Sequence, residues 1–188
     1  MTARFGLAAH IAPAMFSTTA GVKHVTPIPS GVKASKGISL LQGHEFFIKC
    51  DPHMISYEAT SDPSEPVAAI PPERGVTAIA DPKCYSVTDR VHALPAGLWD
   101  SDVVSRYEFI NIERGVFVRI RSPLSVTMES VWEVREKGGP EDLELVEDIV
   151  ISCSRLLMGT VKGTCESGWQ GIHDKMIAHL EEKGEEGA

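Results

Sequence analysis

Two residues on neighbouring predicted strands, Asp89 and Tyr107, have the side chains that acid–base chemistry would need. Alternation along KCYSVTDRV puts Asp89 on the same face of its strand as Tyr85. If that face is interior, the pKa of the Asp89 carboxyl rises unless a cation or a donor is near, and such a carboxyl suits a general acid or base. The alternative is a structural ion pair between Asp89 and an arginine such as Arg119 or Arg121.

Tyr107 could point inward and donate a hydrogen bond to a carbonyl oxygen, as an oxyanion donor does. The alternative is a core tyrosine whose hydroxyl is satisfied by the protein. His173 lies one turn after Trp169 in the last predicted helix, where it could reach the rim of a cavity and move protons near neutral pH. The alternative is a structural or surface histidine. Asp89, Tyr107 and His173 are therefore the candidate catalytic residues.

Aromatic residues and glycines indicate where an apolar ligand would touch the protein. Trp132 is in phase with Met128 and Val134 on a predicted strand, so it belongs to the core or to a cavity wall. The last helix contains four glycines, although each interior glycine costs a helix roughly 1 kcal/mol relative to alanine. They either leave room for a ligand, or mark a kink or a place of close packing. The candidate ligand-binding residues are Tyr85, Trp132, Gly159, Gly163 and Trp169.

Motifs for other chemistries are missing from the sequence. It contains no HExxH, no His/Cys/Asp cluster at metal-ligand spacing, no GxSxG and no phosphate-binding GxxxxGK[ST]. We therefore expect neither a metal ion nor a cofactor.

The composition restricts the partners. The 188 residues are 43% hydrophobic and 23% charged, with a formal net charge of −8 and no basic run, which argues against nucleic-acid binding. No apolar stretch approaches the roughly 20 residues that cross a bilayer. Cys50, Cys84, Cys153 and Cys165 form no CxxC pair, and we expect reduced thiols in a cytoplasmic protein.

The order of the predicted elements defines the fold class. A strand over residues 22–28 precedes one or two short helices within 32–50, and MISYEAT (54–60) is the next strand. After a proline-rich connection, strands follow in rapid succession from residue 83 to 153, before a long C-terminal helix. Strands joined by short turns predict an antiparallel sheet with the helices on one side, so the class is α+β. We expect a leader over 1–20 without fixed structure, a single domain over 21–183 and a frayed tail over 184–188.

Several stretches resemble a known family. They are HVTPIPSGVKASKGISLLQGHEFF, YSVTDRVHALPAGLWDS, ESVWEV and LVEDIVISCSRLLMGTVK, which together run from about residue 22 to 180. They are similar to the START/SRPBCC superfamily of helix-grip domains, and more specifically to fungal START-like proteins of unknown function. The resemblance implies a curved antiparallel sheet wrapped around a long C-terminal helix, with a cavity between them. It supplies no catalytic motif to transfer.

Three functions fit this fold. The first is a cofactor-independent cyclase or isomerase of fungal specialised metabolism, acting on a polyketide- or terpenoid-like molecule in the cavity. The second is a non-catalytic carrier of a lipid or another hydrophobic small molecule, and the third is an interaction module with a filled core. We expect a hydrophobic small molecule as the partner of a monomer or homodimer, with no nucleic acid and no integral membrane segment.

Overall fold

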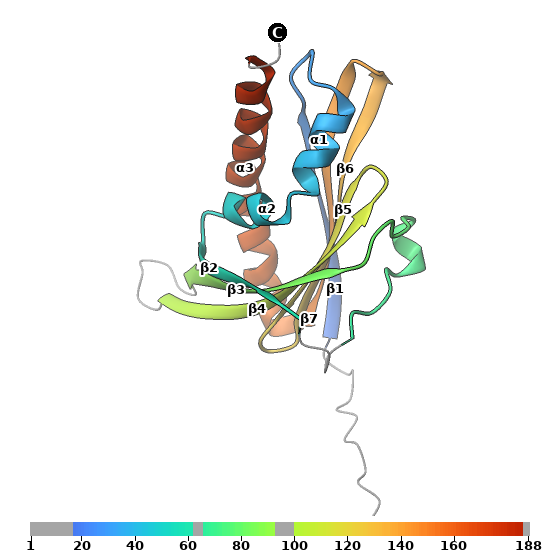
Figure 1. Ribbon diagram of the computed structural model, residues 1–188. Coiled ribbons are helices and arrows are strands. Elements are labelled where there is room, and N and C mark those ends of the chain that lie inside the picture. Colours follow the sequence, from blue (N-terminus) through green and yellow to red (C-terminus); the bar gives the residue numbers. More distant parts are fainter. Residues whose placement is uncertain (1–16, 62–65, 93–99, 186–188) are drawn as a thin grey trace, which may run out of the picture.

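A curved antiparallel sheet forms the centre of the molecule, and its seven strands within the described residues follow the order β1-β7-β6-β5-β4-β3-β2. The computed structural model describes residues 17–61, 66–92 and 100–185. The strands are β1 (Ser17–Pro27), β2 (Met54–Thr60), β3 (Lys83–His92), β4 (Asp100–Ile112), β5 (Gly115–Ser122), β6 (Val126–Gly139) and β7 (Asp142–Ser154). The curvature turns β2, β3 and β4 across the direction of β6 and β7 (Figure 1).

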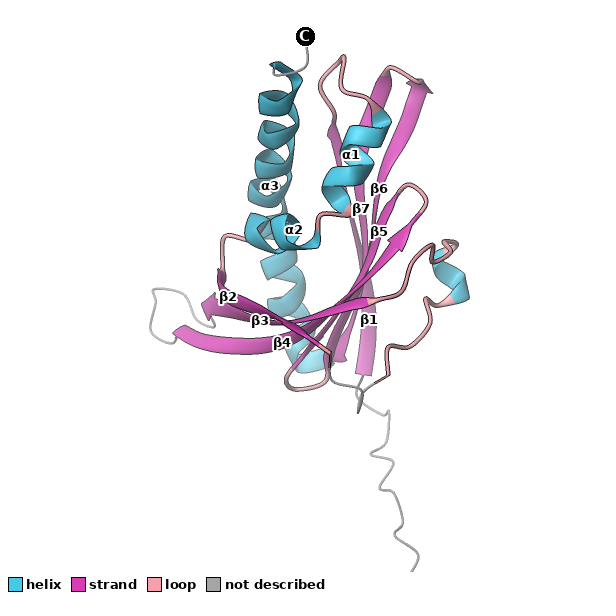
Figure 2. Ribbon diagram, in the orientation of Figure 1, coloured by secondary structure: helices cyan, strands magenta, loops and turns pink. Residues whose placement is uncertain are grey.

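The α-helices lie on the concave face of the sheet. They are α1 (Ala34–Leu41), α2 (His44–Cys50) and the long α3 (Arg155–Glu185), which runs beside the sheet (Figure 2). Their buried side chains, among them Leu41, Ile48 and Met176, join Phe109 and Val118 of the sheet in the main core. Helix α1 approaches β6 closely at Gly37, where a Cβ atom would lie 2.8 Å from a Val134 methyl group. This is the helix-grip arrangement.

The convex face of the sheet carries a second, smaller core. Ile110, Ile112, Phe117 and Val131 are buried there under Val67, Ile70 and Val76 of the connection between β2 and β3. That connection contains a 3₁₀ turn at Pro72–Arg74 and is attached to the edge of β4 by a bridge between Ala78 and Ile112. The proline-rich stretch therefore covers one face of the sheet.

The predicted order of elements is confirmed, and some boundaries shift. Gly43 separates the two short helices, and the strands β2 to β7 follow them before α3. The first strand begins at Ser17 and not at residue 22, because β1 pairs with β7 from Ser17 opposite Ser154. Residues 1–16 of the expected leader, residues 93–99 within YSVTDRVHALPAGLWDS and residues 186–188 of the tail lie outside the described residues.

Candidate functional site

A cavity of about 150 Å³ lies between the concave face of the sheet and α3. Apolar side chains form most of its wall: Phe47, Ile48, Val118, Ile120, Met128, Trp132, Ile149, Trp169 and Ile172. Polar side chains interrupt this wall at Asp51, His53, Tyr107, Ser130, Glu147, Thr164 and Cys165. An apolar wall with a few polar groups is typical of a small-molecule site, and the cavity rules out a completely filled core.

The cavity reaches the surface between α3 and the loop that joins α2 to β2. Pro52 of this loop and Thr164 of α3 line the cavity and are exposed to solvent. Asp51 accepts a hydrogen bond from the main-chain N–H of His53 (2.8 Å), which fixes the turn at the opening. Asp51 and His53 therefore bring a carboxyl group and an imidazole to this opening.

Tyr107 lines the cavity and meets Asp89, which lies beside it. Strand alternation places Asp89, Tyr85 and Tyr107 on the concave face, and Asp89 shares its face with Tyr85 as the sequence predicted. Tyr107 Oη donates a hydrogen bond to Asp89 Oδ2 (3.0 Å), while Asp89 Oδ1 is buried and has no hydrogen-bond partner among the described residues. Burial, reinforced by the nearby Asp51 carboxyl, raises the pKa of Asp89 to about 6.

The arginines considered as partners of Asp89 lie elsewhere. Arg119 and Arg121 project from the convex face, where both guanidinium groups bind the buried carboxylate of Glu108 (3.1 and 3.2 Å). Asp89 therefore does not form the structural ion pair that was its alternative, and it is bound instead by the hydroxyl of Tyr107.

A second polar cluster lies on the wall formed by β1, β7 and α3. His24 Nδ1 donates to Glu147 Oε2 (2.8 Å), and the His24 ring stacks on Trp169 with centroids 4.5 Å apart. His173 is 1% exposed, forms a hydrogen bond with Thr26 Oγ1 through Nδ1 (2.7 Å), and has its Nε2 3.8 Å from Glu147 Oε2. His173 is thus a buried residue of this cluster and is not at a rim.

The remaining predicted ligand-binding residues fall into different environments. Trp132 and Trp169 line the cavity, and Trp132 Nε1 donates to Ser130 Oγ (3.0 Å). Tyr85 belongs to the core, where its ring packs edge-to-face on Phe109. Gly159 and Gly163 are exposed on α3, and a Cβ atom at either position would have no described residue within 4 Å. The glycine that lines the cavity is Gly168.

Sequence reasoning missed four residues of the site: Asp51, His53, His24 and Glu147. Glu147 left a visible signal, because it is in phase with Leu145 and Ile149 in LELVEDIVISC, and a charged residue among apolar ones on an interior face needs a reason. The role of the other three depends on loop geometry and on the pairing of β1 with β7, which the sequence pattern does not contain.

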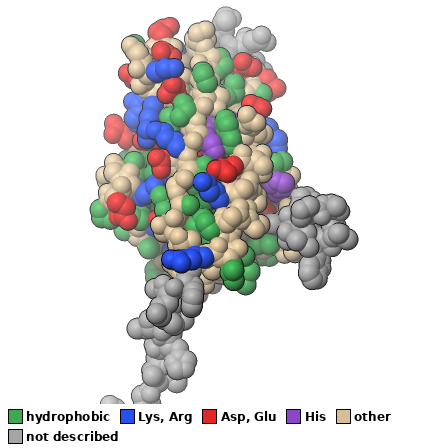
Figure 3. All heavy atoms as spheres, turned by 180° about the vertical axis from the view of Figure 1, so that it is seen from behind, with side chains coloured by type: hydrophobic (Ala, Val, Ile, Leu, Met, Phe, Trp, Pro, Cys, Tyr) green, Lys and Arg blue, Asp and Glu red, His purple; other side chains and the backbone are tan. Residues whose placement is uncertain are grey.

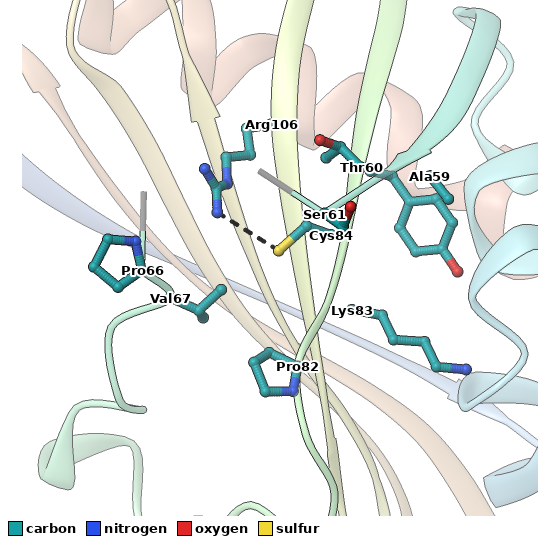
Figure 4. A pocket seen from close by; sticks show the side chains of 10 residues that line it. Ala59, Thr60, Ser61, Pro66, Val67, Pro82, Lys83, Cys84 and Arg106 are labelled. Atoms are coloured by element: carbon teal, nitrogen blue, oxygen red, sulfur yellow. Dashed lines mark hydrogen bonds between the residues drawn. The ribbon is translucent and has the colours of Figure 1, made fainter. Parts of the chain in front are cut away.

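A separate open groove of about 370 Å³ lies at the side of the sheet around β2, β3 and β4. Figure 4 shows Cys84 and Arg106 pointing toward one another in it, with an Arg106 Nη2 to Cys84 Sγ distance of 3.7 Å, and Pro66 and Val67 across from Thr60. It is larger than the cavity but is open to solvent and does not contain the candidate catalytic side chains.

The described part of the chain offers neither a metal centre nor a membrane span. Within it, no group of three or more His, Cys, Asp or Glu side chains is arranged to hold a metal ion. Over the same residues, none of the helices has the length and apolar character needed to cross a membrane.

Comparison with known proteins identifies a family and a fold. Residues 17–182 match the model of a family described as a domain of unknown function (DUF7053). Among solved structures, a norcoclaurine synthase of Thalictrum flavum is 12% identical with a TM-score of 0.57, over 89% of this chain and 97% of that one. The Zhui aromatase/cyclase from Streptomyces sp. R1128 is 12% identical with a TM-score of 0.55, over 87% and 94%. These similarities show that the chain has the helix-grip fold of these structures.

One further similarity covers part of the chain. A pantothenate kinase from Rhizobium leguminosarum bv. trifolii is 33% identical over 81 residues, which are 42% of this chain. The aligned part is 24% of the kinase, so this chain matches about a quarter of the length of its curated relatives.

Proposed function

The chain belongs to the DUF7053 family, and from its cavity we propose that it is a cofactor-independent enzyme of the cyclase or isomerase type acting on an apolar small molecule. The observation that carries the proposal is a pair at the cavity: Tyr107 lines it, and its Oη donates to Asp89, a carboxyl group whose pKa is about 6. A group with such a pKa exchanges protons readily near neutral pH, which acid–base catalysis requires.

The pair can relay a proton without changing the redox state of the substrate. An acidic hydroxyl or C–H of the substrate gives its proton to Tyr107 Oη, while the Tyr107 proton moves to Asp89 Oδ2. Return of both protons, with delivery to a different substrate atom, completes an isomerisation or a ring closure. Protons and electrons balance, so no cofactor takes part in this step.

The cavity also limits the substrate. A volume of about 150 Å³ encloses roughly one benzene-sized ring, whereas drug-sized ligands occupy about 300–1,000 Å³. The reacting ring would occupy the cavity, and the rest of a polyketide- or terpenoid-like substrate would extend through the opening beside Asp51 and His53. The resemblance to fungal START-like proteins, and the cyclase and synthase named among the structural neighbours, support a role in specialised metabolism. We further propose that it works in the cytoplasm as a monomer or homodimer.

The second candidate is a carrier that holds a hydrophobic molecule without changing it. The largely apolar wall favours it, because retention of such a ligand needs burial of apolar surface more than it needs an acid or a base. In a carrier, Asp89 and Tyr107 would have only a structural role.

Native mass spectrometry of the protein purified from its own host, followed by extraction of bound molecules, tests both candidates. For the enzyme, we expect a copurified apolar compound that the wild type converts, and that Asp89→Asn and Tyr107→Phe bind but leave unconverted. Asp102→Asn, on an exposed part of β4, is the control and should convert it normally. A bound compound that stays unchanged with the wild type and with every variant would indicate a carrier. A protein that carries no compound, under conditions that keep a known carrier loaded, would contradict the carrier.

A further inference from the structure

The cluster at β1, β7 and α3 contains an unsatisfied polar atom beside the cavity that Glu147 lines. Glu147 lines the cavity on β7, opposite Trp132 of β6 and two residues before Ile149. The imidazole of His173 is 1% exposed, and its Nε2 has no hydrogen-bond partner among the described residues. Buried polar groups are nearly always hydrogen-bonded, so we expect a hydrogen-bond partner for His173 Nε2.

The distances leave room for one bridging atom. His173 Nε2 is 3.8 Å from Glu147 Oε2, which is too far for a direct hydrogen bond. An oxygen beside the line that joins them can lie at hydrogen-bond distance from both. Glu147 Oε2 already accepts from His24 Nδ1, and an oxygen bears more than one lone pair, so it can accept again.

The groups around the gap determine which hydrogen bonds the bridging atom must donate and accept. The carboxylate of Glu147 favours the His173 tautomer with the hydrogen on Nε2, since that N–H then points toward negative charge. Thr26 Oγ1 completes this tautomer by donating to His173 Nδ1 over 2.7 Å. The bridging atom must therefore accept from His173 Nε2 and donate to Glu147. A hydroxyl oxygen does both, whereas an ether or carbonyl oxygen only accepts and an ammonium group only donates.

We propose that Glu147 and His173 form a subsite for a hydroxyl group on an apolar ring, with the ring against Trp132 and Trp169. This inference rests on the proposed function, because it assumes that the cavity holds a small molecule. It adds the class of ligand: a phenol or a cyclic alcohol. His24 is a positioning residue here, because its ring stacks on Trp169 and its Nδ1 orients the Glu147 carboxylate.

The test uses three probes of nearly equal size that fit one ring. Phenol both donates and accepts, anisole only accepts, and toluene does neither. Titration calorimetry on the full-length protein should give a dissociation constant for phenol at least about tenfold lower than for anisole or toluene, since a buried hydrogen-bonding site discriminates against analogues that leave it unpaired. This order is the reverse of the one expected from apolar burial alone.

Two variants and one spectrum make the test specific. Glu147→Gln should reduce the preference for phenol and leave toluene binding unchanged, because an amide oxygen is a weaker acceptor than a carboxylate. Glu144→Gln, on the same strand but paired with Lys137 and not lining the cavity, should preserve the preference. If Glu147→Gln fails to fold, the ¹⁵N resonance of His173 Nε2 in the wild type should shift with phenol and not with toluene.

The outcomes separate the two proposals. If toluene and anisole bind as tightly as phenol, the gap holds water only and the hydroxyl subsite is wrong, while the ligand cavity stands. If none of the three probes binds, both the subsite and the cavity's proposed function are contradicted.

Discussion

Asp89 is held in a place that disfavours its charge. One carboxyl oxygen is bound by Tyr107 Oη and the other is buried without a hydrogen-bond partner among the described residues. Burial is the largest cause of its raised pKa, followed by the Asp51 carboxyl, while the Tyr107 hydrogen bond acts in the opposite direction. A protein that keeps such a carboxyl gives up some stability for a group that can exchange protons near pH 6.

This environment predicts a pH-dependent effect of Asp89→Asn on stability. Asp89 has a pKa of about 6 in the folded protein and near 3.8 when unfolded, so between these values the folded state binds more protons and stability falls as pH rises. The amide introduced by the substitution carries no charge, so the variant should be more stable than the wild type at pH 8, and the gain should vanish near pH 3.5. Urea denaturation at several pH values measures this difference.

A matched control is Asp102→Asn, whose side chain is half exposed and paired with Arg90 on the surface. It should change stability little, because exposed ion pairs contribute roughly 0–1 kcal/mol. A gain for Asp89→Asn that is the same at pH 3.5 and pH 8 would contradict the account of its environment.

Single residues also show how far sequence reasoning reaches into the site. Alternation is enough to group Asp89 with Tyr85 and Trp132 with Met128 and Val134 on one face of each strand, because a strand has a period of two, but it does not show which face is interior. It cannot reveal that Glu147 pairs with His24, because that contact depends on which strand lies beside β7. The positions of Asp51 and His53 depend on the geometry of a turn, and the sequence pattern does not predict where that turn directs their side chains.

At the scale of elements, the glycines of α3 have a plain consequence. Gly159 and Gly163 lie in the helix interior, are exposed, and have no described residue within 4 Å of the position a Cβ would take. Gly159→Ala and Gly163→Ala should each stabilise the protein by about 0.5–1 kcal/mol, because alanine loses less backbone entropy in a helix. Thermal and urea unfolding measure the gain.

Gly115→Ala on β5 is the opposite case. A Cβ there would collide with the main-chain oxygen of Trp132 on β6, so this substitution should destabilise the protein. If Gly159→Ala or Gly163→Ala also destabilised it, α3 would have to contact something at that face that the described residues do not supply.

Two arginines attach the segment over the convex face to the sheet: Arg74 of the segment binds Asp148 of β7, and Arg119 of β5 binds the segment from below. Arg119 is 2% exposed and donates to the main-chain oxygens of Ala68 (2.8 Å) and Ala69 (3.0 Å) as well as to Glu129 and Glu108. Glu108 is itself 1% exposed. Arg119 therefore joins the connection between β2 and β3 to the sheet.

Arg119→Met should destabilise the protein by about 3–5 kcal/mol, because it leaves the Glu108 carboxylate buried with less compensation. It should also release the connection, which limited proteolysis between residues 66 and 82 would detect. Arg121→Met is the control, since Arg121 is 43% exposed at its side chain and contacts Glu108 from the surface, and a smaller effect is expected. An equal loss of stability in both variants would contradict the proposal that Arg119 holds the connection on the sheet.

The helices and strands are largely predictable from the sequence, but which of them pair or pack together is not. Strong alternation in GVFVRIRS and LELVEDIVISC identifies β5 and β7, and Gly43 marks the break between α1 and α2. The predicted start of β1 is wrong, because STTAG has little apolar pattern and is extended only by pairing along β7. The proline-rich connection is irregular as expected, but its role as a cover over an apolar face follows from packing.

At the scale of the whole molecule, the sheet separates two hydrophobic cores, of which only the one on the concave side adjoins the cavity. The concave side holds the main core and the cavity, and the convex side holds a small core with the ion pairs of Glu108 and Arg119. On the face seen in Figure 3, positive and negative side chains are interspersed with small hydrophobic patches. Substitutions on the convex side should therefore affect stability more than ligand binding.

The neighbourhood of β1 and β7 determines the order in which the chain can fold. Strands β2 to β7 pair with strands next to them in sequence, so their hairpins can form as soon as each is made. β1 is the first strand to be synthesised, but Ser17 can pair only after Ser154 at the end of β7 has been made. At about 5–20 residues per second, a ribosome takes on the order of ten seconds to produce that partner. During that interval β1 has no strand partner. The contact of His24 with Glu147 forms only when β7 arrives, and the cluster with Trp169 and His173 is completed only with α3.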